Sequence, residues 1–155
     1  MRHIITIILC IIVMLCAMFF QVVEVDDILN FYTSTVESLG SRQLTSKLNM
    51  IGERYDKIDD YTGSYKCSAE NVTGRDVIYG GCSVDRIKLN LKGKADTQSG
   101  ELKIRIRLGY GVEYITINDD GTFDELLEFD GGGNYIIIEY EDFTGEIDVS
   151  TEYAE

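Results

Sequence analysis

Leu102-Lys103-Ile104-Arg105-Ile106-Arg107-Leu108 decides the fold, because apolar and cationic side chains alternate along this whole stretch. A period of two is typical of a β-strand that buries one face and leaves the other in water. The same alternation runs through Arg86–Lys92, where the apolar residues are Ile87, Leu89 and Leu91. Both stretches are therefore predicted strands with an apolar inner face and a largely cationic outer face.

The last stretch of the chain alternates in the same way but carries the opposite charge. Ile147, Val149, Thr151 and Tyr153 are interleaved with Glu146, Asp148, Ser150 and Glu152. Opposite charges on facing positions stabilise a β-ladder by roughly 0.2–1 kcal/mol per pair. We therefore expect this acidic strand to pair with a cationic one.

Five further strands are predicted between clusters of turn-forming residues. They are Ser64–Ala69, Val77–Cys82, Glu113–Ile117, Phe123–Phe129 and Tyr135–Tyr140. Parallel pairing needs long crossover connections, and no long helical stretch separates these strands. The sequence predicts a mainly β protein, an antiparallel β-sandwich of about eight strands over residues 59–155.

The N-terminal stretch has the pattern of a membrane-targeting segment. Met1, Arg2 and His3 precede an apolar run, Ile4–Phe20, that is broken only by Thr6. At about 1.5 Å per residue this run spans roughly 26 Å as a helix, close to a bilayer core of about 30 Å. Residues 1–21 are predicted to be a membrane anchor or signal segment, which places the C-terminal domain outside the cytoplasm at the cell membrane. A cleaved signal and a secreted domain are the alternative, although Ala17 offers only a poor cleavage site.

Residues 22–58 are predicted to form an amphipathic helical segment. Val25, Ile28, Leu29, Tyr32, Val36 and Leu39 fall at helical spacing, and a second stripe follows at Leu44, Leu48 and Ile51. These apolar stripes either pack on the body of the same protein or form a coiled-coil-like or partner-binding surface. In the second case residues 22–39 are the expected site of a protein partner or of self-association.

Charge and histidine content exclude several functions. The chain has 27 acidic and 14 basic residues, a net charge of −13, which argues against binding of nucleic acid. The single histidine is His3, so the body has no histidine for a catalytic triad, a general base or a metal site. No catalytic residue and no cofactor is predicted, and we expect a protein that is not an enzyme.

Cys67 and Cys82 are predicted to form a disulfide, because both lie on strands of the exported part, where an oxidising compartment favours pairing. Two reduced thiols, or half of a metal site, are the alternative. Cys10 and Cys16 lie in the apolar run on different helix faces and are not expected to pair.

Asn118, Asp120 and Asp124 are weak candidates for a calcium site, since oxygen ligands gather there around Gly121. The spacing does not match an EF-hand loop, because Thr116 and Leu127 would stand at its end positions. A hairpin turn at Asp120-Gly121 explains the same residues without a metal.

A group of motifs from Tyr61 to the C-terminus resembles uncharacterised exported β-sandwich proteins of low-GC Gram-positive bacteria. They are Tyr61-Thr62-Gly63-Ser64-Tyr65, Val72-Thr73-Gly74, Tyr79-Gly80-Gly81, Gly133-Asn134-Tyr135 with Ile136 and Ile138, and Phe143-Thr144-Gly145. The resemblance implies an immunoglobulin-like module behind a signal or anchor and implies no catalytic residues. The Cys67 and Cys82 pair departs from that pattern.

The layout alone is also similar to type IV pilins and pseudopilins, which place an apolar helix and its amphipathic continuation before a β domain. Their early glutamate is missing, since the first acidic residue is Glu24. Three functions are therefore expected, in order. The first is an anchored extracytoplasmic protein for interaction or envelope structure, the second a pilin-like subunit, and the third a secreted module that binds carbohydrate or calcium.

Overall fold

The computed structural model describes residues 12, 28, 31–35, 39–40, 43–109 and 111–154. The chain divides into two compact units, residues 1–35 and residues 36–155. Residues 31–35 and 39–40 are helical, as the first apolar stripe predicts. The predicted anchor at 1–21 lies, apart from residue 12, outside the described residues. Within the described part, no helix is both long and apolar enough to span a bilayer.

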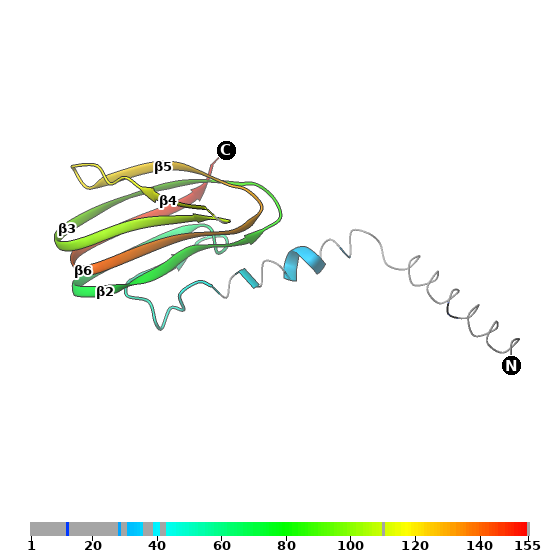
Figure 1. The fold of residues 1–155 in the computed structure, drawn as a ribbon, viewed down its shortest axis with the longest axis horizontal. Coiled ribbons are helices and arrows are strands. Elements are labelled where there is room, and N and C mark those ends of the chain that lie inside the picture. The colour runs from blue at the N-terminus through cyan, green and yellow to red at the C-terminus, as the bar shows by residue number, and fades with distance from the viewer. Residues whose placement is uncertain are drawn as a thin grey trace, which may run out of the picture. The chain divides into compact units, whose positions relative to one another are not determined.

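Six strands form one antiparallel sheet in the second unit (Figure 1). They are β1 (Glu53–Asp56), β2 (Gly63–Ser83), β3 (Ile87–Leu108), β4 (Gly111–Ile115), β5 (Thr122–Phe129) and β6 (Gly132–Tyr153). Their hydrogen-bonded order is β1-β2-β6-β3-β4, and β5 pairs with the first part of β3. The chain is therefore mainly antiparallel β, as predicted.

The three long strands bend near their middles and fold the sheet back on itself (Figure 1). Each bend contains a residue with positive φ: Asn71 (51°) in β2, Gly100 (77°) in β3 and Asp142 (48°) in β6. Glycine adopts this conformation without strain, and Asn and Asp adopt it more readily than other residues. These three positions let the strands turn without leaving the sheet.

Folding the sheet creates two layers. Layer 1 holds β1, the first half of β2, the second half of β6, the first half of β3 and β5 in that order. Layer 2 holds the second half of β2, the first half of β6, the second half of β3 and β4. This order is that of a jelly roll, a β-sandwich in which neighbouring strands continue from one layer into the other. It differs from the immunoglobulin-like order that the sequence resemblance implies.

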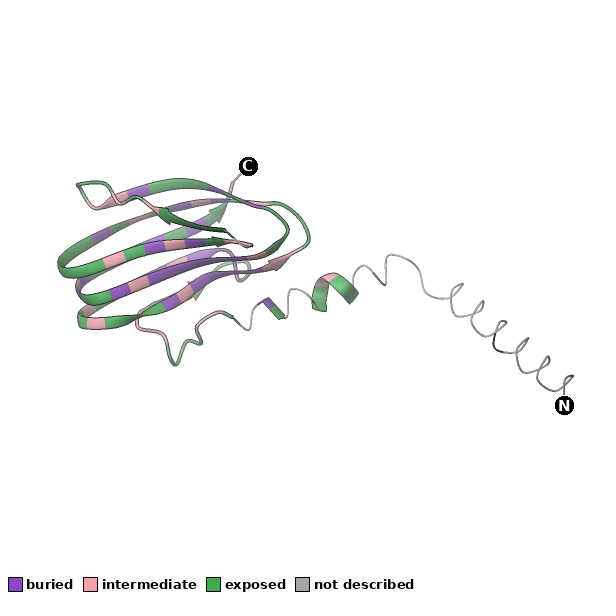
Figure 2. Ribbon diagram, in the orientation of Figure 1, coloured by how far each residue is buried: buried purple, intermediate pink, exposed green. Residues whose placement is uncertain are grey.

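The hydrophobic core lies between the two layers. Inward-facing residues of the long strands are buried and their neighbours are exposed, which gives the alternating colours of Figure 2. Among the largest fully buried side chains are Tyr65, Tyr79, Leu91, Ile106, Phe129 and Ile138. The side-chain period of two seen in the sequence is thus the alternation between core and solvent.

The predicted strands are present, but six of them join in pairs. Ser64–Ala69 and Val77–Cys82 are the two halves of β2, and the other two long strands combine predicted strands in the same way. The expected neighbour of the acidic strand is confirmed, since the second half of β6 lies between the first half of β3 and the first half of β2, but opposite charges face each other only around Asp148. An example is the ion pair between Lys66 Nζ and Asp148 Oδ2 at 2.7 Å.

Residues 43–52 correct the prediction of a second helix. They form turns and an extended segment that, with residues 39–40, runs along layer 2 and is called here the N-terminal strap. Thr45 makes two hydrogen bonds to Val77 at the edge of β2, with its amide and with its hydroxyl. Tertiary hydrogen bonds of this kind override a local helical pattern.

Candidate functional site

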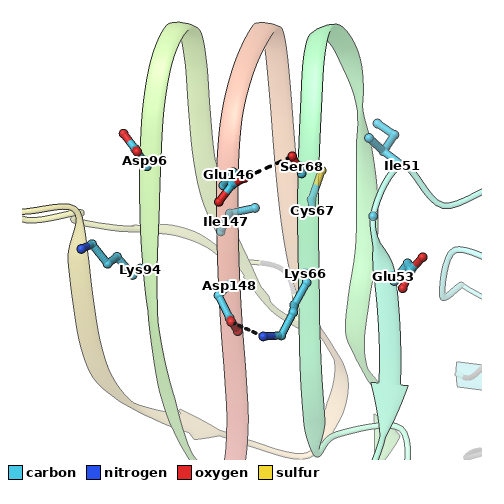
Figure 3. Close-up of a pocket in the computed structure, with 11 residues that line it drawn as sticks. Ile51, Glu53, Lys66, Cys67, Ser68, Lys94, Asp96, Glu146, Ile147 and Asp148 are labelled. Carbon is cyan, nitrogen blue, oxygen red and sulfur yellow. Dashed lines mark hydrogen bonds and ion pairs between the residues drawn. The ribbon is translucent and has the colours of Figure 1, made fainter.

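A groove of about 630 Å³ lies on the outer face of layer 1 (Figure 3). Four adjacent strands, β1, β2, β6 and β3, supply its walls and floor, and the strap ends at its rim with Ile51 and Gly52. The outward positions of these strands are polar because the inward positions carry the core. The charged groups that line it are Glu53, Lys66, Lys94, Asp96, Glu146 and Asp148.

One row of the groove alternates in charge from strand to strand. The pairing register places Glu53 opposite Lys66, Lys66 opposite Asp148 and Asp148 opposite Lys94. Neighbouring strands are about 4.8 Å apart, so each side chain of this row has an opposite charge beside it. The charges of this row therefore neutralise one another within the protein.

In the next row, the negative charges are not neutralised by a facing cation. Glu146 lies directly opposite Asp96, and like charges that face each other across a ladder destabilise it. On the other side of Glu146, the Ser68 hydroxyl donates a 3.4 Å hydrogen bond to Glu146 Oε1 (Figure 3). The groove therefore offers two exposed carboxylates beside the Lys94 ammonium, an arrangement suited to a ligand that brings its own cations.

The structure brings two of the three candidate calcium ligands, Asn118 and Asp120, together at the Thr122 hydroxyl, but not Asp124. Asp120 Oδ1 accepts hydrogen bonds from the amide and hydroxyl of Thr122 at 2.9 and 2.6 Å, which lowers the pKa of Asp120. Asp124 forms an ion pair with Lys92 at 3.2 Å, and the Asn118 side-chain amide donates to Thr122 Oγ1. No group of three or more acidic, cysteine or histidine side chains suited to a metal occurs in the described residues.

The turn at residues 118–121 is closed by hydrogen bonds from the Gly121 amide to the Asn118 carbonyl and from the Asn118 amide to the Thr122 carbonyl, but the strands on either side of it do not form a hairpin. It leads from β4 in layer 2 to β5 in layer 1, and both strands pair with β3 rather than with each other. The Asp-Gly pair therefore connects layers, and Gly121, with φ of 81°, provides the conformation that this turn needs.

The predicted Cys67–Cys82 disulfide is wrong, since both cysteines are free. Cys67 lies in the layer 1 half of β2, whereas Cys82 ends the layer 2 half, where the Tyr61 hydroxyl packs against Gly81. Cys82 pairs with Gly133 and its sulfur lies 3.8 Å from the Tyr135 hydroxyl, whereas Cys67 pairs with Ile147 in the other layer. Burial raises the pKa of the Cys67 thiol, which disfavours a reactive thiolate.

The structure contains a buried hydrogen-bond network that was not predicted from the sequence. Asp76 is fully buried, and its carboxylate accepts hydrogen bonds from the amides of Ile51 and Gly52 and from the Tyr65 hydroxyl. Tyr65 in turn lies 2.6 Å from the Tyr140 hydroxyl. Burial, followed by the bond to Asp76, raises the pKa of Tyr65. The period of two, extended back from Ile78, places Asp76 on the inner face and could have identified it.

The outer face of layer 2 is partly covered by the strap. Tyr135 and Ile137 point outward yet are only 2% and 4% exposed. The Tyr135 hydroxyl donates a 3.2 Å hydrogen bond to the Gly40 carbonyl, and Gln43 accepts one from Arg107. A side chain at position 40 would collide with the backbone of Cys82, so glycine is required for this contact. Burial raises the pKa of Tyr135 to about 12.

Among solved structures, the chain is similar to the pre-peptidase C-terminal domain of a collagenase from Bacillus anthracis. The two share 12% sequence identity at a TM-score of 0.46, and the match covers 59% of this chain and 90% of that domain. Neither a protein-family model nor a curated protein matches the chain. What the chain does must therefore be inferred from its own residues.

Proposed function

We propose that the chain is a non-enzymatic, membrane-anchored extracytoplasmic protein whose jelly roll binds a partner through the groove on layer 1. The basic tip and the apolar run Ile4–Phe20 support the anchor. The acidic body, with a net charge of −13 for the whole chain, suits an exposed soluble domain. The observation that carries the binding role is the groove itself, where Glu146 faces Asp96 without a cation between them.

The chemistry of the groove favours binding over catalysis. General acid and base groups work in environments that shift their pKa values apart, which usually means burial. The groove carboxylates Asp96 and Glu146 are exposed, and Cys67 at its floor is a buried thiol with a raised pKa. These side chains can hold charges in place but are poorly suited to move protons or attack a substrate.

The partner is inferred from the charges that it must match. Asp96 and Glu146 require a cationic group, and Lys94 can accept a carboxylate beside it. An extended protein segment that carries both lysine and glutamate side chains meets both requirements. We therefore propose a mixed-charge peptide segment of another protein as the ligand class.

Binding can be tested with a fluorescent octapeptide of alternating lysine and glutamate and the full chain in detergent. Fluorescence anisotropy should show saturable binding that Glu146→Lys weakens at least tenfold. Glu125→Lys makes the same change of charge outside the groove, on β5, and is the matched control. Equal weakening by both variants, or no binding to the unaltered chain, would contradict a groove-specific site.

A pilin-like subunit is the second candidate, and the strap favours it. The contacts of Gly40 with Tyr135, and of Thr45 with Val77, hold the strap on the sandwich. In the sequence the strap directly follows the segment 22–39 through which such a subunit would assemble.

A further inference from the structure

One wall of the layer 1 groove includes the end of the strap. Ile51 and Gly52 of the strap and Glu53, the first residue of β1, line this wall, and Figure 3 shows Ile51 and Glu53 there. A side chain at position 52 would collide with the Tyr65 hydroxyl and the Lys66 carbonyl, so glycine lets the strap approach β2 closely. The shape of the groove therefore depends on where the end of the strap lies.

A buried carboxylate behind this wall holds the end of the strap. Asp76 is fully buried, and its Oδ2 accepts hydrogen bonds from the Ile51 amide at 2.9 Å and from the Gly52 amide at 3.0 Å. Hydrogen bonds to an ionised group are among the stronger ones in proteins. The Ile51 side chain also packs over Gly74, where an added Cβ would lie 3.0 Å from Ile51 Cδ1. Asp76 thus acts on the groove through the strap, as a positioning residue.

The rest of the strap is attached to layer 2, away from the groove. The Gly40 carbonyl accepts a hydrogen bond from Tyr135. The Thr45 amide donates to the Val77 carbonyl at 3.0 Å, and the Thr45 hydroxyl accepts from the Val77 amide at 2.8 Å. None of residues 43–52 is buried. Segments with few buried contacts open more readily than a core, so the strap can leave the sandwich while the two layers stay folded.

We propose that docking of the strap and binding of ligand in the layer 1 groove are coupled, so that the groove holds its ligand tightly only while the strap is docked. This coupling rests on the proposed function, because the ligand is the mixed-charge segment inferred for the groove. An event that displaces the strap at Tyr135 or Val77 on layer 2 reaches the groove through Ile51 and Gly52. Coupling between two sites is reciprocal, so the bound ligand also holds the strap in place.

Two variants of the full chain loosen the strap and leave the side chains of the groove unchanged. Asp76→Asn replaces one acceptor oxygen with an amide group that donates, and Thr45→Val removes the hydroxyl that binds the Val77 amide. In detergent, each variant should speed amide hydrogen exchange at residues 51 and 52. Each should also weaken binding of the lysine–glutamate octapeptide at least fivefold, as measured by fluorescence anisotropy. In the unaltered chain, saturating peptide should slow exchange of the Thr45 amide.

Each variant has a matched control. Tyr140→Phe damages the same buried network as Asp76→Asn, but the hydroxyl that it removes is bonded to Tyr65 and not to the strap. Thr73→Val makes the same change as Thr45→Val, because the Thr73 hydroxyl accepts a 2.9 Å hydrogen bond from the Asp142 amide, at the bends of β2 and β6. Both controls should bind the octapeptide with an affinity within twofold of that of the unaltered chain.

The outcomes separate the coupling from the proposed function. A strap variant with faster exchange at residues 51 and 52 but unchanged affinity for the peptide would overturn the coupling alone. Unchanged exchange at these residues in both strap variants would do the same, as would equal weakening of binding in the controls or a Thr45 amide that the peptide leaves unaffected. A peptide that does not bind the unaltered chain would overturn the coupling and the proposed function together.

Discussion

The Tyr65 hydroxyl donates a 2.6 Å hydrogen bond to the carboxylate of Asp76, although both residues belong to strand β2. Tyr65 lies in layer 1 and Asp76 in layer 2, so this bond spans the sandwich across the bend at Asn71. Because the only hydroxyl proton of Tyr65 goes to Asp76, Tyr140 must donate to Tyr65. The same carboxylate holds the strap through Ile51 and Gly52. One buried side chain thus joins both layers and the strap.

Tyr65→Phe should lower the free energy of unfolding by about 1–3 kcal/mol, since it removes a buried donor from a carboxylate. Tyr61→Phe is the control, because the Tyr61 hydroxyl is buried without a hydrogen-bond partner in the described part of the chain. Its removal should leave stability unchanged within about 0.5 kcal/mol or raise it. Urea unfolding followed by circular dichroism measures both, and equal losses would contradict the network.

Asp76→Asn should release the strap more than it loosens the core. The amide that replaces the carboxylate has one acceptor oxygen fewer for Ile51, Gly52 and Tyr65. The substitution should speed amide hydrogen exchange at residues 51 and 52. The increase in exchange rate there should be at least ten times the increase at core residues such as Ile104. An equal acceleration at all of these amides would indicate global destabilisation and no local role in fixing the strap.

The thiols should react in a fixed order in protein purified without reductant. Cys82 is half-buried and should be alkylated slowly in the native state, whereas buried Cys67, with its raised pKa, should react after unfolding. Mass spectrometry of the alkylated peptides distinguishes the two. Protection of both thiols after unfolding, relieved by reductant, would show the disulfide that the structure lacks.

The pKa of Asp120 should rise toward its usual value in Thr122→Val. The hydroxyl of Thr122 is the main cause of the lowered pKa, and its amide remains as a weaker one. A carboxyl whose pKa is lower in the folded state stabilises the fold above the unfolded-state pKa, and this contribution is lost as the pH falls through the folded-state pKa. Carbon NMR titration of the carboxyl checks the shift, and an unchanged pKa would refute the assignment.

The strands and their faces could be predicted from the sequence because alternation is a local property. Leu102–Leu108 and Glu146–Tyr153 turn toward the core the side chains that the pattern indicates, except that Tyr153 is 42% exposed. The two stretches do not pair with each other, since Leu102–Leu108 lies beside the first half of β6 and Glu146–Tyr153 beside the first half of β3. The bends could not be predicted so readily. Asn71 and Asp142 adopt positive φ at positions where neither glycine nor proline interrupts the strand.

The strap and the cysteines show where local patterns fail. Leu44, Leu48 and Ile51 have helical spacing, yet the structure leaves Leu48 97% exposed and ties Ile51 to Asp76, 25 residues away in the sequence. Cys67 and Cys82 lie on one strand that bends from one layer into the other. Their spacing in the sequence does not reveal which residues lie beside each other once the strand has bent. Both errors concern contacts that exist only in the folded chain.

Labelling of intact cells with a membrane-impermeant, amine-reactive biotin tests the central claim most directly. Lys88 and Lys92 lie on the outer face of layer 1 with side chains 53% and 56% exposed, so an extracytoplasmic sandwich offers them to the reagent. The account predicts labelling of these lysines on intact cells, in a protein that sediments with the membrane fraction. Labelling only after lysis, together with a cytoplasmic marker, would contradict it.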